Sequence, residues 1–256
     1  MINTSLVIAV YNGERTLDEA FASVASQTHP IAQVVVVNDG STDKTSLIIE
    51  RWKETLPLLV INNVSNLGLA NSLNIGVRYA TGELVFRLDA DDVWCPNHVE
   101  VIVELSLSCP QAVLLSSRAY ILNNKGKLAG ITSAVMDRNI RAKLFWDNPV
   151  VHSAVAFRRR AYNEVGGYIH QSFAVDYDLW IRLLKSGRYA GTTEVTTYYH
   201  VLSSSLSRIK KTDSLRVRLS LGLSAVKLFG VKHPFVAVFI LPVILIRILK
   251  NRVYCL

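Results

Sequence analysis

The chain has 256 residues, of which 50% are hydrophobic and 19% are charged. This length and composition predict a folded protein with one large domain or two small ones, and they exclude a disordered chain. The cysteines Cys95, Cys109 and Cys255 show no CxxC or Cys/His spacing, so we expect no disulfide framework or zinc site, and we expect a reducing compartment.

The net charge of +8 is concentrated near the C-terminal end of the sequence. From Arg208 onward there are ten Lys/Arg and one acid, so this segment carries +9 and the remainder −1. It also contains the uncharged stretch PFVAVFILPVILI (234–246), which is too short to span a bilayer, since spanning takes about 20 apolar residues. We predict that 208–256 is a helical tail that binds an anionic membrane surface; alternatively, it packs on the folded core with its lysines in solvent. No nucleic acid is expected as a partner, because no aromatic–basic interleaving accompanies the charge.

Short apolar runs alternate with helical patterns in the first third of the chain. The N-terminal run SLVIAV is interpreted as a strand, not a signal peptide, because no basic n-region precedes it and Gly13 ends the apolar stretch early. We predict strands at 5–10, 33–37, 58–62 and 83–88, and helices at 14–27, through Leu47, Ile48 and Arg51, and at about 68–80. Ser41 or Thr42 is expected to cap the second helix. This alternation implies right-handed crossovers and an open parallel sheet with helices on both faces.

The rest of the chain has a less regular pattern. Pro96 favours a helix over 96–108, and strands are predicted at 111–117 and 153–157. The segment DYDLWIRLLKSG (176–187) is an amphipathic helix with acids in its first turn and a glycine at its end. Residues 118–150 have little periodicity, and we make no assignment there.

Three polar clusters follow predicted strands: YNG (11–13), NDGSTD (38–43) and DADD (89–92). In open parallel sheets, ligands bind at the carboxyl ends of the strands, so we expect these clusters to line one site. The sequence has no GxxxxGK[ST], no GxGxxG after its first strand and no GxSxG, which argues against a P-loop, a dinucleotide site and a serine hydrolase. The remaining candidate is a site whose chemistry depends on carboxylates. Asp89 and Asp91 suit Mg²⁺ or Mn²⁺ bound to a substrate diphosphate, although a solvated loop would also explain them.

Several segments, taken in order, resemble one enzyme family. They are IAVYNGERTL, VVVNDGSTD, NLGLANSLNIG (66–76), TGELVFRLDADD, HSAVAFRRRAYNEVGGY (152–168) and DYDLWIRL, and together they resemble the family 2 glycosyltransferases with the GT-A fold. The resemblance covers about residues 3–208. It implies an α/β fold with a Rossmann-like, mostly parallel central sheet flanked by helices. It also implies inverting transfer of a sugar from a nucleotide diphosphate, expected to be UDP, to an acceptor hydroxyl.

The same resemblance implies a division of the chain. A catalytic domain would cover 1–207, with a nucleotide-sugar-binding half at 1–92 and an acceptor-binding half at 93–207. The basic, apolar tail at 208–256 would follow it.

Donor binding is carried over by position to ten residues: Ala9, Val10, Tyr11, Glu14, Asp39, Asn66, Gly68, Asn71, Asp89 and Ala90. The resemblance implies that the first three flank the base and that Asp39 accepts a hydrogen bond from it, as from uracil N3–H. Alternatives remain open for three of them. Asp39 would also suit a turn or helix cap, Glu14 a first-turn acid, and Asn71 an ordinary polar position on a helix.

The resemblance also assigns metal ligands. Asp91 would coordinate Mn²⁺ or Mg²⁺ on the diphosphate, and Asp89 would touch the ribose or the metal. Asp92 is expected to be an N-cap or a supporting acid. Arg87 either offsets these acids or lies on the surface.

Asp176 is the predicted catalytic base, which deprotonates the acceptor hydroxyl. The family usually shows Glu-Asp before this helix, whereas this chain has Val175-Asp176. Simple helix capping is the alternative, and it suits Asp178 better. Trp180 is expected in the core and not as a platform for a sugar.

Other positions depart from the family or leave its roles open. Relatives often carry Arg-x-His near the end of the catalytic domain, where this chain has His200 and Leu202. His152 lies near the acceptor or diphosphate, or is a satisfied core histidine. The run Arg158, Arg159 and Arg160 attracts an acceptor pyrophosphate or forms a solvated face.

We expect a cytoplasmic enzyme, peripheral on the inner face of the cytoplasmic membrane, that builds a surface polysaccharide on a lipid-linked saccharide acceptor. Two alternatives are a polyprenyl-phosphate glycosyltransferase and a non-catalytic scaffold that binds nucleotide sugars. A nucleotidyltransferase is disfavoured, because YNGERT supplies no glycine-rich phosphate loop.

Overall fold

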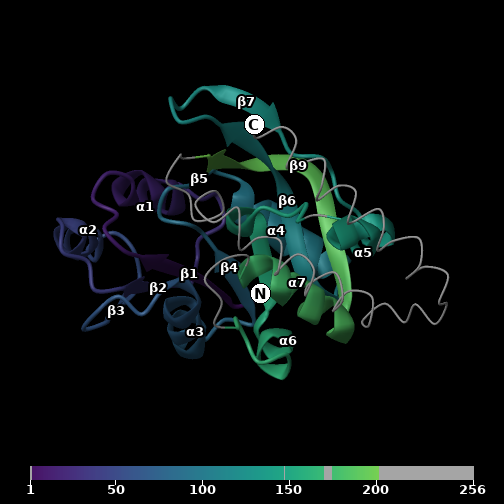
Figure 1. The fold of residues 1–256 in the computed structure, drawn as a ribbon, viewed down its shortest axis with the longest axis horizontal. Coiled ribbons are helices and arrows are strands. Elements are labelled where there is room, and N and C mark those ends of the chain that lie inside the picture. The colour runs from purple at the N-terminus through teal and green to yellow at the C-terminus, as the bar shows by residue number, and fades with distance from the viewer. Residues whose placement is uncertain (1, 147, 170–174, 202–256) are drawn as a thin grey trace, which may run out of the picture.

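A curled mixed sheet with helices on both faces forms the centre of the structure (Figure 1). The computed structural model describes residues 2–146, 148–169 and 175–201. Its strands are β1 (Thr4–Val10), β2 (Gln33–Asn38), β3 (Leu58–Asn62), β4 (Leu84–Arg87), β5 (Val93–Trp94), β6 (Ala112–Leu122), β7 (Leu128–Ile131), β8 (Val155–Arg158) and β9 (Arg188–His200). Its helices are α1 (Leu17–Ala25), α2 (Thr45–Trp52), α3 (Leu69–Tyr79), α4 (His98–Ser108), α5 (Asp137–Trp146), α6 (Arg159–Glu164) and α7 (Val175–Ser186), with a 3₁₀ turn at His152–Ala154.

The first four strands form a parallel block in the order β3-β2-β1-β4. This block and the helices between its strands confirm the predicted alternation. Helix α1 begins at Leu17, three residues later than predicted, because residues 12–14 form a loop that bonds to the β2–α2 loop. Loops at the carboxyl ends of β1 to β4 therefore meet at one edge of the sheet.

Beyond β4 the sheet is mixed. Strand β8 runs antiparallel to β4 and β6, whereas β9 runs parallel to β6 and antiparallel to β5. Parallel pairing is thus confirmed for the first half of the chain, and antiparallel pairs extend the sheet in the second half. Residues 118–150 contain the end of β6, the hairpin strand β7 and α5. Because β7 is mostly exposed, it lacks the apolar alternation that would have predicted it.

Alternating strand residues supply two apolar cores, one on each face of the sheet. Leu6, Ile8 and Phe86 pack with α1, α2 and α4, whereas Val7 and Val35 pack with α3, α6 and α7. Figure 1 shows α1 and α2 on the opposite side of the parallel strands from α3 and α6. The two covered faces explain why the strands read as continuous apolar runs.

The start of α2 differs from the prediction. The helix begins at Thr45, and the Asp43 side chain accepts the Thr45 backbone N–H at 3.0 Å. The Ser41 hydroxyl instead accepts the Asn12 N–H at 3.0 Å, and the Thr42 N–H donates to Asn12 Oδ1 at 2.9 Å. Neither Ser41 nor Thr42 caps the helix, because both bind the neighbouring β1–α1 loop.

Gly40 lets the loop after β2 approach the loop after β3. Its φ is +72°, and a Cβ there would lie 2.6 Å from the Ser65 carbonyl carbon. Gly126 has a similar φ of +69° but open space around it. Gly126→Ala should therefore lower the free energy of unfolding by only about 1–2 kcal/mol, the cost of the left-handed backbone.

We expect Gly40→Ala to lower the free energy of unfolding by about 1–3 kcal/mol more than Gly126→Ala does, because its methyl group would also clash with the backbone of the loop after β3. Urea unfolding of both variants measures the difference. Equal losses would show that the close approach at Gly40 is absent in solution.

The predicted tail at 208–256 and Leu202 lie outside the described residues. Within the part of the chain that the structure describes, no helix is both long and apolar enough to cross a bilayer.

Candidate active site

Two loops at the sheet edge are joined by hydrogen bonds. In the β1–α1 loop, Asn12 has φ +53° and exchanges bonds with Ser41 and Thr42. The Gly13 N–H donates to Thr45 Oγ1 at 2.8 Å in the β2–α2 loop. The exposed Tyr11 ring and the buried Asp39 are therefore held on adjoining loops.

The Asp39 carboxylate organises the loop that precedes α3. Its Oδ1 accepts Asn63 Nδ2 at 2.7 Å and the Leu67 N–H at 2.8 Å, while Oδ2 accepts the Gly68 N–H at 3.0 Å. Asp39 thus bonds the loop that precedes α3, and these bonds are neither a turn nor a helix cap in its own NDGSTD segment. Oδ2 has one protein donor and retains capacity for a ligand donor.

The other predicted donor residues lie around these loops. Ala9 and Val10 are buried in β1, and Ala90 is half-buried beside the β1–α1 loop. Asn66 is exposed, Gly68 has φ +86° before α3, and Asn71 Nδ2 donates to the Leu67 carbonyl at 2.7 Å. The structure therefore gathers these residues along the ends of β1, β2 and β3.

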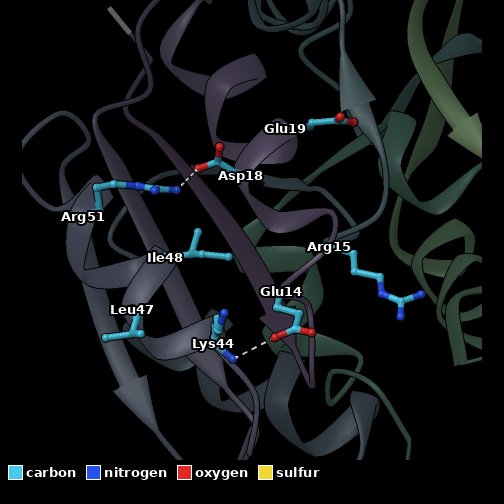
Figure 2. Close-up of a pocket in the computed structure, with 8 residues that line it drawn as sticks. All are labelled: Glu14, Arg15, Asp18, Glu19, Lys44, Leu47, Ile48 and Arg51. Atoms are coloured by element: carbon cyan, nitrogen blue, oxygen red, sulfur yellow. Dashed lines mark hydrogen bonds and ion pairs between the residues drawn. The ribbon is translucent and has the colours of Figure 1, made fainter.

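Glu14 faces a different hollow (Figure 2). This hollow of about 630 Å³ lies between the start of α1 and α2, and its lining residues are Glu14, Arg15, Asp18, Glu19, Lys44, Leu47, Ile48 and Arg51. Glu14 accepts the Lys44 backbone N–H at 3.2 Å. None of the predicted metal-binding or catalytic aspartates lines this hollow.

Three groups surround the carboxylate of Asp89. The fully buried Arg87 guanidinium pairs with Oδ1, the Ser153 hydroxyl lies 3.2 Å from Oδ2, and His152 Nδ1 lies 3.6 Å from Oδ2. Burial opposes ionisation of Asp89, but Arg87, His152 and Ser153 outweigh it, so the pKa lies below its ordinary value. Arg87 therefore offsets the acids and is not a surface arginine.

Asp91 and Asp92 occupy different environments. The Asp92 side chain is buried and accepts the Ser153 hydroxyl and the His200 N–H, the latter at 2.8 Å. It holds the loop to β9, as expected of a supporting acid, and is not an N-cap. Asp91 has no side-chain partner among the described residues. Burial and then repulsion from Asp89 raise the pKa of Asp91 to about 6.

Asp176 lies in the first turn of α7, where Asn148 Nδ2 donates to its Oδ2 at 2.6 Å. Burial, followed by the negative charge of Asp89, raises the pKa of Asp176 to about 6. Asp178 instead pairs with Arg182 one turn along α7, at 2.6 Å. Asp178 thus has a structural role through this ion pair within the helix and not through a helix cap. Trp180 is fully buried in the core as predicted.

Tyr199 of β9 marks the point where carboxylates from both halves of the chain meet. Burial raises the pKa of its hydroxyl, and the neighbouring carboxylates raise it further: Asp92, Asp89, Asp176 and Asp91. Because Coulomb effects fall with distance, the DADD acids and Asp176 all lie within electrostatic reach of this hydroxyl.

His152 and His200 both border this site. His152 is a satisfied histidine, because the Tyr168 hydroxyl lies 2.8 Å from Nε2. It also faces Asp89, and its place near the acceptor or diphosphate stays a prediction. Burial, then the Arg87 charge, lower the pKa of His152 to about 3. His200 Nδ1 lies 4.0 Å from Asp92 Oδ1, and its charge would lower the pKa of Asp91.

The arginine run after β8 has partners within the fold. Arg158 pairs with Glu83, Arg159 donates to the Gly82 carbonyl at 2.9 Å, and Arg160 pairs with Glu164 at 2.9 Å. Of the three, only Arg160 lies on a solvated face, because its side chain is 91% exposed.

The acids after β4 fit a divalent cation in part. The Asp91 charge is opposed by burial and by Asp89 and is only partly offset by Arg87 and His200, which is the environment that a cation would stabilise. Within the described ranges, no three His, Cys, Asp or Glu residues form a complete metal site. A metal held by Asp91 and Asp89 would thus take further ligands from the substrate and water.

Sequence reasoning missed four residues of the site: Asn148, Ser153, Tyr168 and Tyr199. Ser153 joins Asp89 to Asp92, and it stands inside the segment HSAVAF that carried the resemblance. Asn148 lies in the unpatterned region, so no periodic signal could have found it. Tyr168 and Tyr199 adjoin Gly167 and His200, and only the fold shows what they face.

The chain is similar in sequence to known glycosyltransferases. The profile of the family Glycosyl transferase family 2 matches residues 5–167. The amylovoran biosynthesis glycosyltransferase AmsE of Erwinia amylovora is 30% identical over 186 residues, covering 72% of this chain and 70% of AmsE. The UDP-Glc:α-D-GlcNAc-diphosphoundecaprenol β-1,3-glucosyltransferase WfaP of Escherichia coli is 28% identical over 225 residues, covering 86% of this chain and 87% of WfaP.

The fold also matches a solved structure. TarS 1–349 of S. aureus in complex with UDP-GlcNAc has a TM-score of 0.72 at 19% identity, over 88% of this chain and 67% of that chain. This likeness identifies the fold as GT-A, and the described part of this chain is an enzyme fold of that type. Because the family profile covers more than half of its residues, the chain belongs to glycosyl transferase family 2.

Proposed function

We propose that this glycosyltransferase transfers a sugar from a UDP-sugar to a hydroxyl of a lipid-linked saccharide, with inversion at the anomeric carbon. The observation that carries the proposal is the meeting of Asp89, Asp91 and Asp176 near Tyr199. These carboxylates come from the proposed donor half, 1–92, and acceptor half, 93–207. An inverting transfer needs a base on the acceptor side and charge neutralisation on the leaving-group side.

Asp176 acts on the acceptor. Its carboxylate accepts the proton of the acceptor hydroxyl while that oxygen attacks the anomeric carbon. The oxygen–carbon bond forms as the bond from this carbon to the phosphate oxygen breaks, and the nucleoside diphosphate leaves with the electron pair. A single displacement without a covalent enzyme intermediate inverts the anomeric centre. Asn148 donates to one Asp176 oxygen and thereby orients the carboxylate that accepts the proton.

The donor half holds the nucleotide and its charge. Tyr11 and Asp39 bind the base, and the loop at Asn66 and Gly68 lies along the diphosphate. Asp91, with Asp89, would hold Mn²⁺ or Mg²⁺. When bound, this cation would supply positive charge against the leaving diphosphate.

Two relatives support the choice of donor and acceptor. The names of WfaP and of the TarS complex include UDP-Glc and UDP-GlcNAc, and WfaP acts on a GlcNAc carried by diphosphoundecaprenol. A lipid-linked acceptor also agrees with the basic, apolar sequence of 208–256, for which we propose binding to the inner face of the cytoplasmic membrane.

Truncation after residue 207 should then release the protein from anionic vesicles, and unchanged binding would refute this role.

The test of the proposed reaction is a product assay. The full chain with Mn²⁺ is incubated with UDP-sugars and either polyprenyl-diphosphate-GlcNAc or polyprenyl phosphate, and the product mass is measured. A product whose mass equals that of the lipid-linked saccharide plus one sugar supports the proposal. A product only from polyprenyl phosphate would favour the alternative that the enzyme makes a lipid-linked donor, and no product with any UDP-sugar would contradict the proposal.

The pH dependence of the reaction follows from Asp176. Since its pKa is raised to about 6, kcat/KM at saturating Mn²⁺ should be constant near pH 8 and fall about tenfold per pH unit well below pH 6. An ordinary aspartate would keep activity constant down to about pH 4. A pH–rate profile without a fall near pH 6 would therefore show that Asp176 is not the base.

A further inference from the structure

A chain of hydrogen bonds runs from α3 to His152, whose imidazole faces the carboxylate of Asp89. Asn74 Oδ1 accepts the Tyr162 hydroxyl at 2.5 Å and the Tyr168 N–H at 2.9 Å, and its Nδ2 donates to the Tyr168 carbonyl at 2.7 Å. The Tyr168 hydroxyl lies 2.8 Å from His152 Nε2, and His152 Nδ1 lies 3.6 Å from Asp89 Oδ2. The imidazole is therefore held between a phenol and a carboxylate.

Packing fixes the orientation of this imidazole. Its side chain is only 10% exposed, and its ring makes edge contacts with Tyr168 and Trp180, at centroid distances of 5.7 and 5.8 Å. Asn74 fixes Tyr168 in turn through two backbone bonds. The ring consequently presents Nε2 to Tyr168 and Nδ1 to Asp89.

We propose that Tyr168 and His152 are positioning residues for Asp89: the Tyr168 hydroxyl donates to Nε2, which puts the imidazole proton on Nδ1, facing the carboxylate. The opposite tautomer would point the Nδ1 lone pair at a carboxylate oxygen, so that two acceptors would face each other. At 3.6 Å the Nδ1–H and Asp89 interact by charge and dipole, not by a short hydrogen bond.

This arrangement restricts the orientation of the Asp89 carboxylate. Arg87 and Ser153 bind the same carboxylate, and His152 adds a third contact, on the side of Oδ2. Together they fix the direction in which Asp89 can offer a lone pair to the donor or its metal. The role of Asp89 in binding the donor or its metal rests on the proposed function, whereas the position of the ring proton does not.

The first test reads the tautomer directly in metal-free protein without donor. Long-range ¹H–¹⁵N spectra near pH 8 should show the Nδ1–H form of His152 in the wild type. Tyr168→Phe should weaken this preference, because only the Asp89 carboxylate then favours the Nδ1–H form. Tyr162→Phe removes a hydroxyl from the same network without touching His152, and it should keep the wild-type pattern. An Nε2–H form in the wild type, or an unchanged spectrum in Tyr168→Phe, would overturn the proposal.

The second test separates the two nitrogen atoms of the ring. In His152→Asn the amide nitrogen replaces Nδ1, and in His152→Gln it replaces Nε2. We expect His152→Asn to keep Mn²⁺ affinity and kcat/KM within about threefold, and His152→Gln to lose about 10–100-fold in both. A glutamine variant as good as the asparagine variant would contradict the proposal. If no sugar transfer occurs at all, the Mn²⁺ titrations and the spectra still decide it.

Discussion

Asp176→Asn is expected to lower kcat/KM for sugar transfer by about 10²–10⁴-fold, the range that a general base contributes. Asparagine has nearly the same shape, and its carbonyl oxygen can still accept the Asn148 amide that now bonds Asp176. The variant therefore loses the proton acceptor while it keeps the local geometry. Initial rates at pH 8 with saturating Mn²⁺ measure the loss, and a rate within about threefold of wild type would refute the assignment of Asp176.

Stability distinguishes this loss from misfolding. Folding raises the pKa of Asp176 to about 6, so its contribution to stability is greatest below about pH 4 and is lost as the pH rises through 6. At pH 8 the buried, ionised carboxylate destabilises the fold. Asp176→Asn should consequently be at least as stable as wild type at pH 8 in urea unfolding.

Asp178→Asn is the matched control, two residues along the same helix. Asp178 pairs with Arg182 at 2.6 Å and is 9% exposed. Removing this partly buried pair should cost about 1–3 kcal/mol of stability while the rate stays within about tenfold of wild type. We therefore expect opposite patterns for the two variants: Asp176→Asn loses rate, and Asp178→Asn loses stability.

Asp91→Asn is expected to lower kcat/KM by about 10²–10³-fold, because charge stabilisation by the metal at the leaving group is worth several kcal/mol. Asp91 has no side-chain partner among the described residues, and burial and Asp89 raise its pKa. Its substitution should therefore leave the free energy of unfolding unchanged or increase it. Mn²⁺ titration should show weaker binding in the presence of UDP.

Asp137→Asn controls for the removal of one negative charge. Asp137 pairs with Arg188 at 2.6 Å, away from the DADD cluster, so Mn²⁺ affinity should stay as in wild type. Equal Mn²⁺ affinity in Asp91→Asn and wild type would remove Asp91 from the metal site.

The parallel half of the fold was predictable from the sequence because its strands are continuous apolar runs, and β1, β2 and β4 are buried on both faces. QVVVV and LLVIN are apolar runs that match β2 and β3, with β3 matching at both bounds. Strand β9 was not predicted, since its residues TTEVTTYYH mix exposed and buried positions. Its place between β6 and β5 depends on pairing between distant segments, which local periodicity does not encode.

The candidate site was predictable where function depends on residues that directly follow strands. Asp39, Asp89 and Asp91 were found in this way. The resemblance separated the roles of Asp91 and Asp92, but the partners of Asp92, Ser153 and His200, could not be derived because they are distant in sequence. The resemblance pointed to Asp176, and the fold brings it near Asp89.

The configuration of the product tests the central claim most directly. With a UDP-α-sugar as donor and a lipid-linked saccharide as acceptor, the anomeric coupling constant of the product is read by NMR. A single displacement with Asp176 as base predicts a β-linked product from the α-linked donor. An α-linked product would require a covalent or dissociative route with retention and would contradict the account.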